Sequence, residues 1–351
     1  KDYFVTELEK NNKGCCYSYN GRQRKINQTK RSSIDLKDCI FPYIKFDRPE
    51  FNAILDWIKS KTITETKGVF SDLLENELGD VAKYCKLKKK RQKKFTKPND
   101  SKILEYKEKH PMGWLSEEPL KSGKVSYYWN WNVSESLNVV INDLEYVFGT
   151  GGLHASVESQ IIEACDNYII VDQDVASYYP NLAIKNKVYP EHLGETFCDI
   201  YGEMYQQRKS YAKGTTENAM LKLALNGSYG ASNDQFSPLY DPMFTMKITI
   251  NGQLSLCMLA EKLLEIEGLK MIQCNTDGLT YYCKKEDDER AQKICDDWCD
   301  ITKLDLERAD YSKMPIRDVN NYVAVYTNGD TKCKGAYEYE GLGWNKNHSA
   351  L

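Results

Sequence analysis

Apolar residues recur along this chain at two spacings, and each spacing predicts its own kind of element. Apolar side chains every three or four residues predict helices over residues 47–58, 70–84, 201–211, 217–229, 248–267 and 287–302. Short β-branched and aromatic runs predict strands over residues 168–171, 271–274, 279–283 and 322–326. Turn chemistry at residues 275–278 joins the middle two strands as a hairpin, and Asn328-Gly329 predicts a second hairpin that continues from residue 332.

The strand predicted over residues 168–171 runs directly into two carboxylates, Asp172 and Asp174. Because side chains alternate between the two faces of a strand, both carboxylates point the same way. Such a concentration of negative charge is costly unless a cation lies beside it, so a bound cation is the first hypothesis. A solvated loop with two acids explains these residues equally well when they are taken alone.

The two helices over residues 201–211 and 217–229 are predicted to form a short antiparallel hairpin. On the second helix Lys222, Asn226 and Tyr229 share one face, because they are spaced by four and then three residues. The side chains on that face are able to bind an anionic ligand.

The sequence also predicts the local structure at three other positions of the helical hairpin. Thr216 is the expected N-cap of the second helix. Gly227 and Gly230 each cost a helix about 1 kcal/mol relative to alanine, so the sequence predicts that something packs closely against them.

Two acids and two cations form a chemical pattern across these elements. Asp174 ends one strand and Asp277 is expected at an exposed hairpin tip, while Arg208 and Lys222 face each other across the helical hairpin. Magnesium prefers carboxylate and phosphate oxygens, and a pair of magnesium ions can activate one oxygen and stabilise the leaving one. The pattern therefore predicts nucleotidyl transfer from a triphosphate.

Three stretches in the same order also resemble the motifs of one enzyme family. Residues 174–180 (DVASYYP) resemble the D-x-x-S-L-Y-P of family B DNA polymerases, residues 222–230 (KLALNGSYG) their K-x-x-x-N-S-x-Y-G, and residues 275–278 (NTDG) their D-T-D-S. The chain is most similar to phage-type members. In those, residues 148–154 correspond to the glycine-rich linker segment near the template, and residues 332–337 to the lysine–tyrosine motif at the primer duplex.

The resemblance implies a role for individual residues. The implied catalytic residues are Asp174 and Asp277, which with the Val175 carbonyl hold two Mg²⁺ ions, for which Mn²⁺ can substitute. The implied nucleotide-binding residues, which contact phosphates, sugar or the nascent base pair, are Ser177, Tyr178, Tyr179, Arg208, Lys222, Asn226 and Tyr229. Of these, Tyr179 is expected beneath the sugar, where its ring excludes a 2′-hydroxyl. The implied DNA-binding residues are Gly151, Gly152, Lys332, Lys334 and Tyr337.

The resemblance also implies an α+β fold, with a palm of antiparallel β-sheet packed on helices, a short two-helix fingers hairpin and a mixed N-terminal region. The palm is expected over residues 146–190 and 231–326 and the fingers over residues 191–230. Residues 327–351 are expected to begin a thumb that is truncated here, and residues 1–145 to form a template-side region without an assigned function. No acidic exonuclease motif is recognisable in that region. The N-terminus lacks both an initiator methionine and the pattern of a secretory signal, so the chain is expected to be a piece of a longer protein.

Three residues depart from the family motifs. Asn275 replaces the first acid of D-T-D-S, which should spare catalysis if Asp174 and Asp277 suffice. Gly227 and Gly278 replace serines, so the hydrogen bonds of those serines are expected to be missing.

Composition narrows the class of protein further. The net charge is −3, 41% of residues are hydrophobic, and no apolar run approaches the 18 residues of a membrane span. Twelve scattered cysteines without a C-x-x-C pair favour a reducing compartment, and we expect a cytoplasmic location, in a host cell if the gene is viral. The basic run over residues 86–97 is more often a solvated helix face or a mobile segment than a phosphate contact, and the aromatic stretch over residues 114–131 is more often core than a base-stacking platform.

The sequence leaves several functions open. The leading hypothesis is a DNA-directed DNA polymerase that binds primer-template DNA and deoxynucleoside triphosphates; the alternatives are an RNA-synthesising palm enzyme and an inactive nucleic-acid-binding fragment. Residues 181–221 and 231–274 are too short to hold the extra subdomains of protein-primed polymerases, so no terminal protein is expected as a partner. Replication accessory proteins are not identifiable from the sequence.

Overall fold

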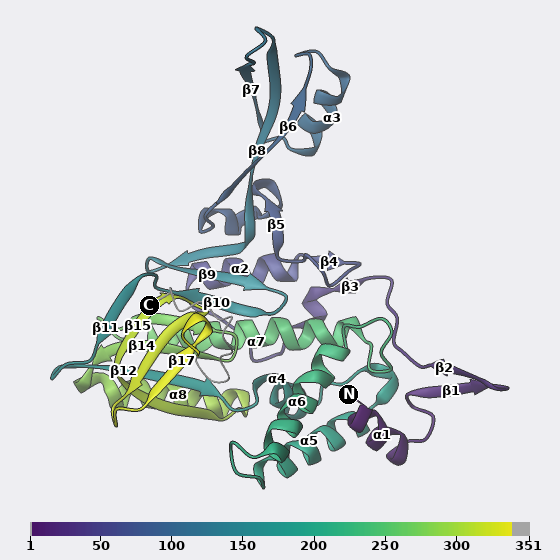
Figure 1. Cartoon of the computed structure of the whole chain (residues 1–351), viewed down its shortest axis with the longest axis vertical. Helices are drawn as coiled ribbons and strands as arrows, with labels where there is room; N and C mark the ends of the chain where they lie inside the picture. The colour runs from purple at the N-terminus through teal and green to yellow at the C-terminus, as the bar shows by residue number, and fades with distance from the viewer. Residues whose placement is uncertain (1, 339–351) are drawn as a thin grey trace, which may run out of the picture.

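The computed structural model describes residues 2–338, and its centre is one antiparallel sheet of 13 strands (Figure 1). Along the hydrogen-bonded path the strands are β17 (Thr331–Lys334), β16 (Asn321–Tyr326), β15 (Leu306–Asp318), β12 (Tyr168–Val175), β14 (Gly278–Lys284), β13 (Lys270–Asn275), β10 (Gly152–Ser156), β9 (Leu144–Gly149), β8 (Val125–Ile141) and β5 (Ser71–Leu74). Off this path β11 (Gln160–Glu163) pairs with β15, while β6 (Lys89–Phe95) and β7 (Trp114–Pro119) pair with β8. Two separate ladders join β1 (Tyr17–Asn20) to β2 (Gln23–Ile26) and β3 (Ile34–Asp35) to β4 (Thr62–Ile63).

The α-helices of the described chain lie against this sheet or flank it. They are α1 (Asp2–Asn11), α2 (Pro49–Lys59), α3 (Ser101–Lys109), α4 (Tyr178–Asn186), α5 (Thr196–Lys209), α6 (Thr216–Ala231), α7 (Pro242–Leu263) and α8 (Asp288–Thr302). The predicted α+β class with an antiparallel sheet is confirmed. Within residues 2–338 no helix is both long and apolar enough to cross a membrane.

The pleat of β12 separates the core of the protein from its acidic side chains. Val171 and Val175 belong to the large core that includes α7 and α8, whereas Ile170 belongs to a smaller core on the opposite face of the sheet. Asp172 and Asp174 follow Ile170 at intervals of two residues, so they stand on the face that α7 and α8 do not cover. The predicted common direction of the two carboxylates is confirmed by a lysine that contacts both.

Helix α7 is the buried axis to which the N-terminal segment is attached. The Asn251 side chain accepts a hydrogen bond from the Phe41 N–H and donates one to the Cys39 carbonyl, each at 2.7 Å. In the last turn of the helix, the Glu261 carboxylate accepts the N–H groups of Asp47 and Arg48. These side chains satisfy backbone groups that would otherwise be buried without partners.

Helices α5 and α6 form the predicted antiparallel hairpin (Figure 1). The N-cap is Thr215 rather than Thr216, because the Thr215 hydroxyl accepts from the Asn218 N–H and leaves Thr216 as the first helical residue. Helix α1 packs behind the hairpin, where the Phe4 and Phe197 rings meet edge to face with centroids 5.1 Å apart.

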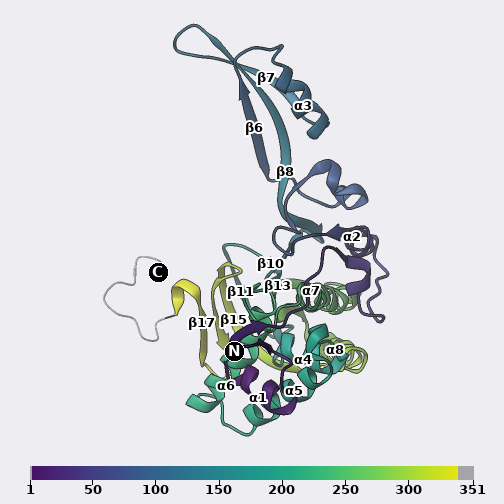
Figure 2. The same cartoon turned by 90° about the vertical axis from the view of Figure 1, so that its right-hand side faces the viewer.

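The largest difference from the sequence prediction lies in residues 70–133. The helix predicted over residues 70–84 is wrong, because this stretch forms strand β5 and two short 3-10 helices. The basic run is neither a helix face nor a loop, since β6 is a strand hydrogen-bonded along its whole length to β8. Residues 86–133, which we call the arm, comprise β6, α3, β7 and the first half of β8, and they project far from the rest of the molecule (Figures 1 and 2).

One further local prediction is wrong. Close packing was expected against Gly227 and Gly230, but a Cβ built at either position meets nothing within 4 Å outside the backbone of its own helix. The surface of α6 is therefore open at these glycines.

We expect Gly227→Ala to raise the free energy of unfolding by about 0.5 to 1 kcal/mol, because alanine restricts the unfolded chain and no neighbour obstructs its methyl group. The matched control is Gly252→Ala in the interior of α7, where the new Cβ would lie 3.0 Å from the Tyr179 Cε1. That variant should gain nothing or lose stability. Urea denaturation of both variants tests the contrast, and an equal gain in both would contradict it.

Candidate active site

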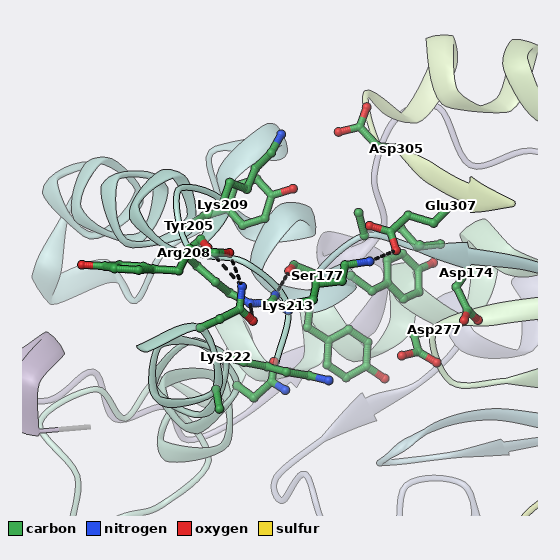
Figure 3. A pocket seen from close by; sticks show the side chains of 18 of the residues that line it. Asp174, Ser177, Tyr205, Arg208, Lys209, Lys213, Lys222, Asp277, Asp305 and Glu307 are labelled. Atoms are coloured by element: carbon green, nitrogen blue, oxygen red, sulfur yellow. Dashed lines mark hydrogen bonds and ion pairs between the residues drawn. The ribbon is translucent and has the colours of Figure 1, made fainter. Parts of the chain in front are cut away.

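All the residues that the sequence predicted for metal and nucleotide binding line one cleft of about 1130 Å³ (Figure 3). They are Asp174, Val175, Ser177, Tyr178, Tyr179, Arg208, Lys222, Asn226, Tyr229 and Asp277. The carboxylates come from the ends of β12 and of the β13–β14 hairpin, and the cations come from the helical hairpin on the opposite side. The cleft thus has one acidic wall and one basic wall.

Strand pairing brings the two acidic segments together. Asp174 is the ladder partner of Gly278, and the Val175 N–H donates to the Asp277 carbonyl at 2.7 Å. A Cβ at Gly278 would collide with the Asp174 carboxylate and lie 2.7 Å from the Gln173 carbonyl. The close approach of β12 therefore requires glycine at this position. The geometry of this chain thus explains why position 278 has no serine.

The protein raises the affinity of both carboxylates for protons. Burial, with a further contribution from Asp172, raises the pKa of Asp174 to about 6. Burial also raises the pKa of Asp277, although part of its side chain reaches solvent at the rim of the cleft as the predicted hairpin tip requires. Each shift means that burial makes the charged form of the carboxylate costly.

The Lys332 ammonium lies between two of these acids. Its Nζ is 3.2 Å from Asp174 Oδ2 and 3.4 Å from Asp172 Oδ2, and the two acids raise the pKa of the lysine. Asp172 is only 7% exposed and also accepts hydrogen bonds from the Tyr311 and Thr280 hydroxyls, each at 2.6 Å. The sequence assigned Lys332 to the primer duplex, whereas in the structure it contacts the acidic cluster.

The turn after β12 directs a serine hydroxyl toward the basic wall. Ser177 has φ 45° and ψ 56°, a left-handed conformation that costs a non-glycine residue about 1 to 3 kcal/mol. In this turn the Arg208 Nη1 donates to Ser177 Oγ at 2.5 Å, and the Arg208 Nε donates to Asn218 Oδ1 at 3.4 Å. Ser177 thereby fixes a guanidinium group at the mouth of the cleft (Figure 3).

Two adjacent tyrosines form the floor of the cleft. The buried Tyr178 hydroxyl donates to the Gly252 carbonyl at 2.5 Å, while the Tyr179 hydroxyl donates to the Gly151 carbonyl at 2.9 Å. Burial raises the pKa of Tyr179 well above its ordinary value, so this phenol keeps the proton that it donates. The Tyr179 ring packs against Tyr229 with centroids 4.7 Å apart, which gives it a fixed orientation.

The predicted DNA-binding residues divide into two groups. Gly151 and Gly152 adjoin the cleft, and a Cβ at Gly152 would lie 3.0 Å from the Tyr179 hydroxyl and 2.8 Å from Thr276 Cγ2. Lys334 ends β17 and Tyr337 belongs to a 3-10 helix; neither lines the cleft. Residues 339–351 of the predicted thumb lie outside the described residues.

Two acidic residues at the start of β15 belong to the cleft, although the sequence did not predict them. Asp305 and Glu307 line the cleft, and the Lys213 Nζ from the helical hairpin reaches Glu307 at 2.9 Å. Glu307 comes beside Asp174 only because β15 pairs with β12. No local signal marks these residues, since the pairing joins segments more than 130 positions apart.

The donor set of the cleft suits divalent cations that prefer oxygen ligands. Asp172, Asp174 and Asp277 bring three carboxylates to one end of the sheet, and Lys332 contacts two of them. Burial raises the pKa of Asp174 and Asp277, and a bound cation would offset the cost of their charged forms. Carboxylate oxygens are the ligands that Mg²⁺ and Mn²⁺ prefer. Asp174 and Asp277, with the Val175 carbonyl, therefore fit the predicted metal ions.

Among residues 2–338, one group of His, Cys, Asp or Glu side chains has at least three ligand atoms within 4.8 Å of one another, and it is formed by Glu9, Cys15 and Cys16. The Glu9 carboxylate already accepts N–H groups from Gly14, Cys16 and Tyr17. Burial raises the pKa of both thiols, so they stay protonated and are poor metal ligands. We assign this group to the anchoring of the chain after α1.

Comparisons with known proteins give a distant structural likeness and no match in sequence. The sequence matches no protein-family model, and no curated protein matches it. Among solved structures the chain is similar to the family B DNA polymerase from the hyperthermophilic archaeon Pyrobaculum calidifontis, with a TM-score of 0.36 and 15% sequence identity. The likeness covers 51% of this chain and 28% of that polymerase, so the chain spans well under half of its length. At this level the likeness carries no functional weight, and the function is proposed below from the site residues.

We expect Lys332→Met to lower the free energy of unfolding at pH 7 by about 2 to 4 kcal/mol, because it leaves the buried Asp172 and the half-exposed Asp174 without their cation. A raised pKa means that the folded state binds the Asp174 proton more tightly, so stability falls as the pH rises from 3.8 to about 6. In the variant this fall should be steeper and extend to higher pH.

Urea titrations at pH 4.5 and 7.5 measure the difference. The control is Lys293→Met, which breaks an exposed ion pair with Asp297 on α8 and should cost less than about 0.5 kcal/mol at either pH. Equal, pH-independent losses in the two variants would show that Lys332 does not offset the acidic cluster.

Proposed function

We propose that this chain is the catalytic core of a DNA-directed DNA polymerase, a nucleotidyltransferase that adds deoxynucleotides to the 3′-hydroxyl of a primer. The observation that carries the proposal is the single cleft in which Asp174 and Asp277 stand opposite Arg208 and Lys222. Carboxylates on one wall and cations on the other suit a triphosphate bound together with metal ions. The family motifs at these same residues support the reaction class.

Each wall of the cleft contributes a separate function. Asp174 and Asp277 would hold two Mg²⁺ ions, which when bound lower the pKa of the attacking hydroxyl and stabilise the leaving oxygen. Arg208 and Lys222 would neutralise phosphate charge, with Arg208 already oriented by Ser177. The backbone N–H groups at the start of α4, next to Ser177, add the positive end of a helix dipole to the same place.

The fixed position of Tyr179 supports the choice of deoxynucleotides. Its hydroxyl is bonded to the Gly151 carbonyl, and its ring is held between Tyr229 and the backbone at Gly252. A ring that is restrained on three sides cannot move aside for a 2′-hydroxyl. This favours DNA synthesis over the RNA-synthesising alternative.

The elements between the motifs support synthesis from a nucleic-acid primer. Residues 181–221 are occupied by α4, α5 and the start of α6, and residues 231–274 by turns, α7 and β13. No additional subdomain is inserted in either interval, and both intervals lie wholly within the described chain. We therefore propose that the enzyme extends a primer without a terminal protein.

Asp174→Asn and Asp277→Asn should each reduce nucleotide incorporation by at least a factor of ten, equivalent to about 1.4 kcal/mol of barrier, because each removes a ligand for the metal ions. Primer extension on a primed template in Mg²⁺ measures the loss, with circular dichroism to verify folding. Asp297→Asn on the exposed face of α8 is the matched control and should keep full activity.

Retention of more than about a tenth of the activity in Asp277→Asn would contradict the assignment. The same assay with an unprimed linear duplex should give no nucleotide attached to protein. Covalent labelling of a protein in that reaction would contradict priming by nucleic acid.

Tyr179→Ala should lower discrimination against ribonucleotides by about tenfold or more, because the clash with the 2′-hydroxyl disappears with the ring. The measurement is the ratio of kcat/KM for a deoxynucleotide to that for the matching ribonucleotide. Tyr205→Phe, which also lies along the cleft, should leave this ratio unchanged. An unchanged ratio in Tyr179→Ala would leave Tyr179 a packing residue only.

A further inference from the structure

The arm concentrates positive charge in an otherwise acidic chain. Residues 86–133 contain thirteen lysines and arginines and five acidic residues, whereas the whole chain has a net charge of −3. The arm also carries six of the fifteen exposed large hydrophobic side chains of the described residues, namely Leu104, Met112, Trp114, Leu115, Leu120 and Val125. Cations and exposed apolar groups on one projecting element indicate an interaction surface.

One face of the three-stranded arm sheet is already covered. Helix α3 packs Ile103 against Phe95 and Trp129, and the His110 and Trp131 rings stack with centroids 4.0 Å apart. The cations that point to this face have partners there. Arg91 forms an ion pair with Asp72 at 2.5 Å, and the Lys93 Nζ lies 6.0 Å from the Tyr106 ring centroid.

The opposite face has no helix over it and presents cations beside aromatic rings. Along β6 the side chains alternate between the two faces of the sheet. Lys90 and Lys94 lie an odd number of positions from Lys93, so they point to the opposite face, away from α3. The Lys90 Nζ lies 5.6 Å from the centroid of Trp114, and the Lys94 Nζ lies 5.9 Å from the centroid of Tyr128. No carboxylate of residues 2–338 forms an ion pair with either lysine. Trp114 is 41% exposed.

We propose that this open face, formed by Lys90, Lys94, Trp114 and Tyr128, binds a single strand of nucleic acid outside the catalytic cleft. The lysines complement phosphates, and they stand about 13 Å apart because their positions differ by four residues along an extended strand. The rings offer flat surfaces to bases, which single strands expose and duplexes keep within their own stack. The inference rests on the proposed polymerase function only for the expectation that the strand is DNA.

Fluorescence anisotropy with the whole chain tests the proposal. The probes are labelled single-stranded DNA, single-stranded RNA of the same sequence and the corresponding DNA duplex, at 50 to 200 mM salt in EDTA. The double variant Lys90→Ala/Lys94→Ala should weaken single-strand binding at least tenfold. It should also reduce the slope of log K against log salt by about 1.4, the value for two lost phosphate contacts on a single strand.

The control Lys93→Ala/Lys107→Ala removes the same charge from the side of the arm that carries α3, where Lys93 and Lys107 lie against Tyr106 and Trp129. It should weaken binding by less than about threefold, since only the long-range field changes. Trp114→Ala should weaken single-strand binding about tenfold and leave duplex binding unchanged, while Trp114→Phe should restore most of the loss. Thermal denaturation verifies that each variant is folded.

Equal losses in the two lysine double variants, or equal binding of single strand and duplex without an effect of Trp114→Ala, would overturn the proposal. Binding of vesicles of phosphatidylcholine and phosphatidylserine with the same dependence on Lys90 and Lys94, in place of the oligonucleotides, would overturn it as well. A preference for RNA over DNA would still support a surface that binds single strands, but its ligand would then be RNA. Because the assay needs no incorporation, an inactive chain that still binds through the arm would contradict only the polymerase function.

Discussion

One ammonium group, that of Lys332, offsets the negative charge of the acidic side chains on β12. The shape of the sheet is what brings this ammonium group to them. Lys332 lies on β17, three strands away from β12 along the hydrogen-bonded path, yet its Nζ contacts Asp172 and Asp174. The ladder between β15 and β16 changes register twice, near Tyr311 and near Ile316. Such bulges increase local twist, and here the edge of the sheet curls back so that β17 overlies the cluster. Without that curl three carboxylates would share one end of a sheet with no adjacent cation.

Local signals were sufficient for the motif residues that line the cleft, but not for the acidic residues at the start of β15. Asp174 follows an apolar strand, Asp277 sits in a turn of recognisable chemistry, and Lys222 shares a helical face with Asn226, so each position could be predicted from fewer than ten neighbours. The structure brings these segments together at one cleft, although the assigned roles remain predictions. The contact of Lys332 with the acidic cluster and the presence of Glu307 in the cleft were not predicted, because both depend on pairing between distant strands.

The arm was not predictable for a different reason. The strand β6 is lysine-rich and exposed along nearly its whole length, so it lacks the apolar alternation by which a half-buried strand is recognised. Its partner β8 begins thirty residues later, and only that pairing makes the stretch a strand. The helix predicted over residues 70–84 failed similarly, since Leu73 and Leu74 are drawn into β5 by their pairing with the middle of β8. In both places long-range hydrogen bonding overrides local preference.

Strand β8 connects the arm directly to the sheet that carries the cleft. It is one strand of 17 residues whose first half builds the arm and whose second half pairs with β9, which in turn joins β10 and Gly152 beside Tyr179. Strand β8 runs without a break through both parts, so the arm is joined rigidly to the sheet that carries the cleft. A molecule that touched both the arm and the cleft would lose no entropy in ordering a tether, and its second contact would form at a high effective concentration.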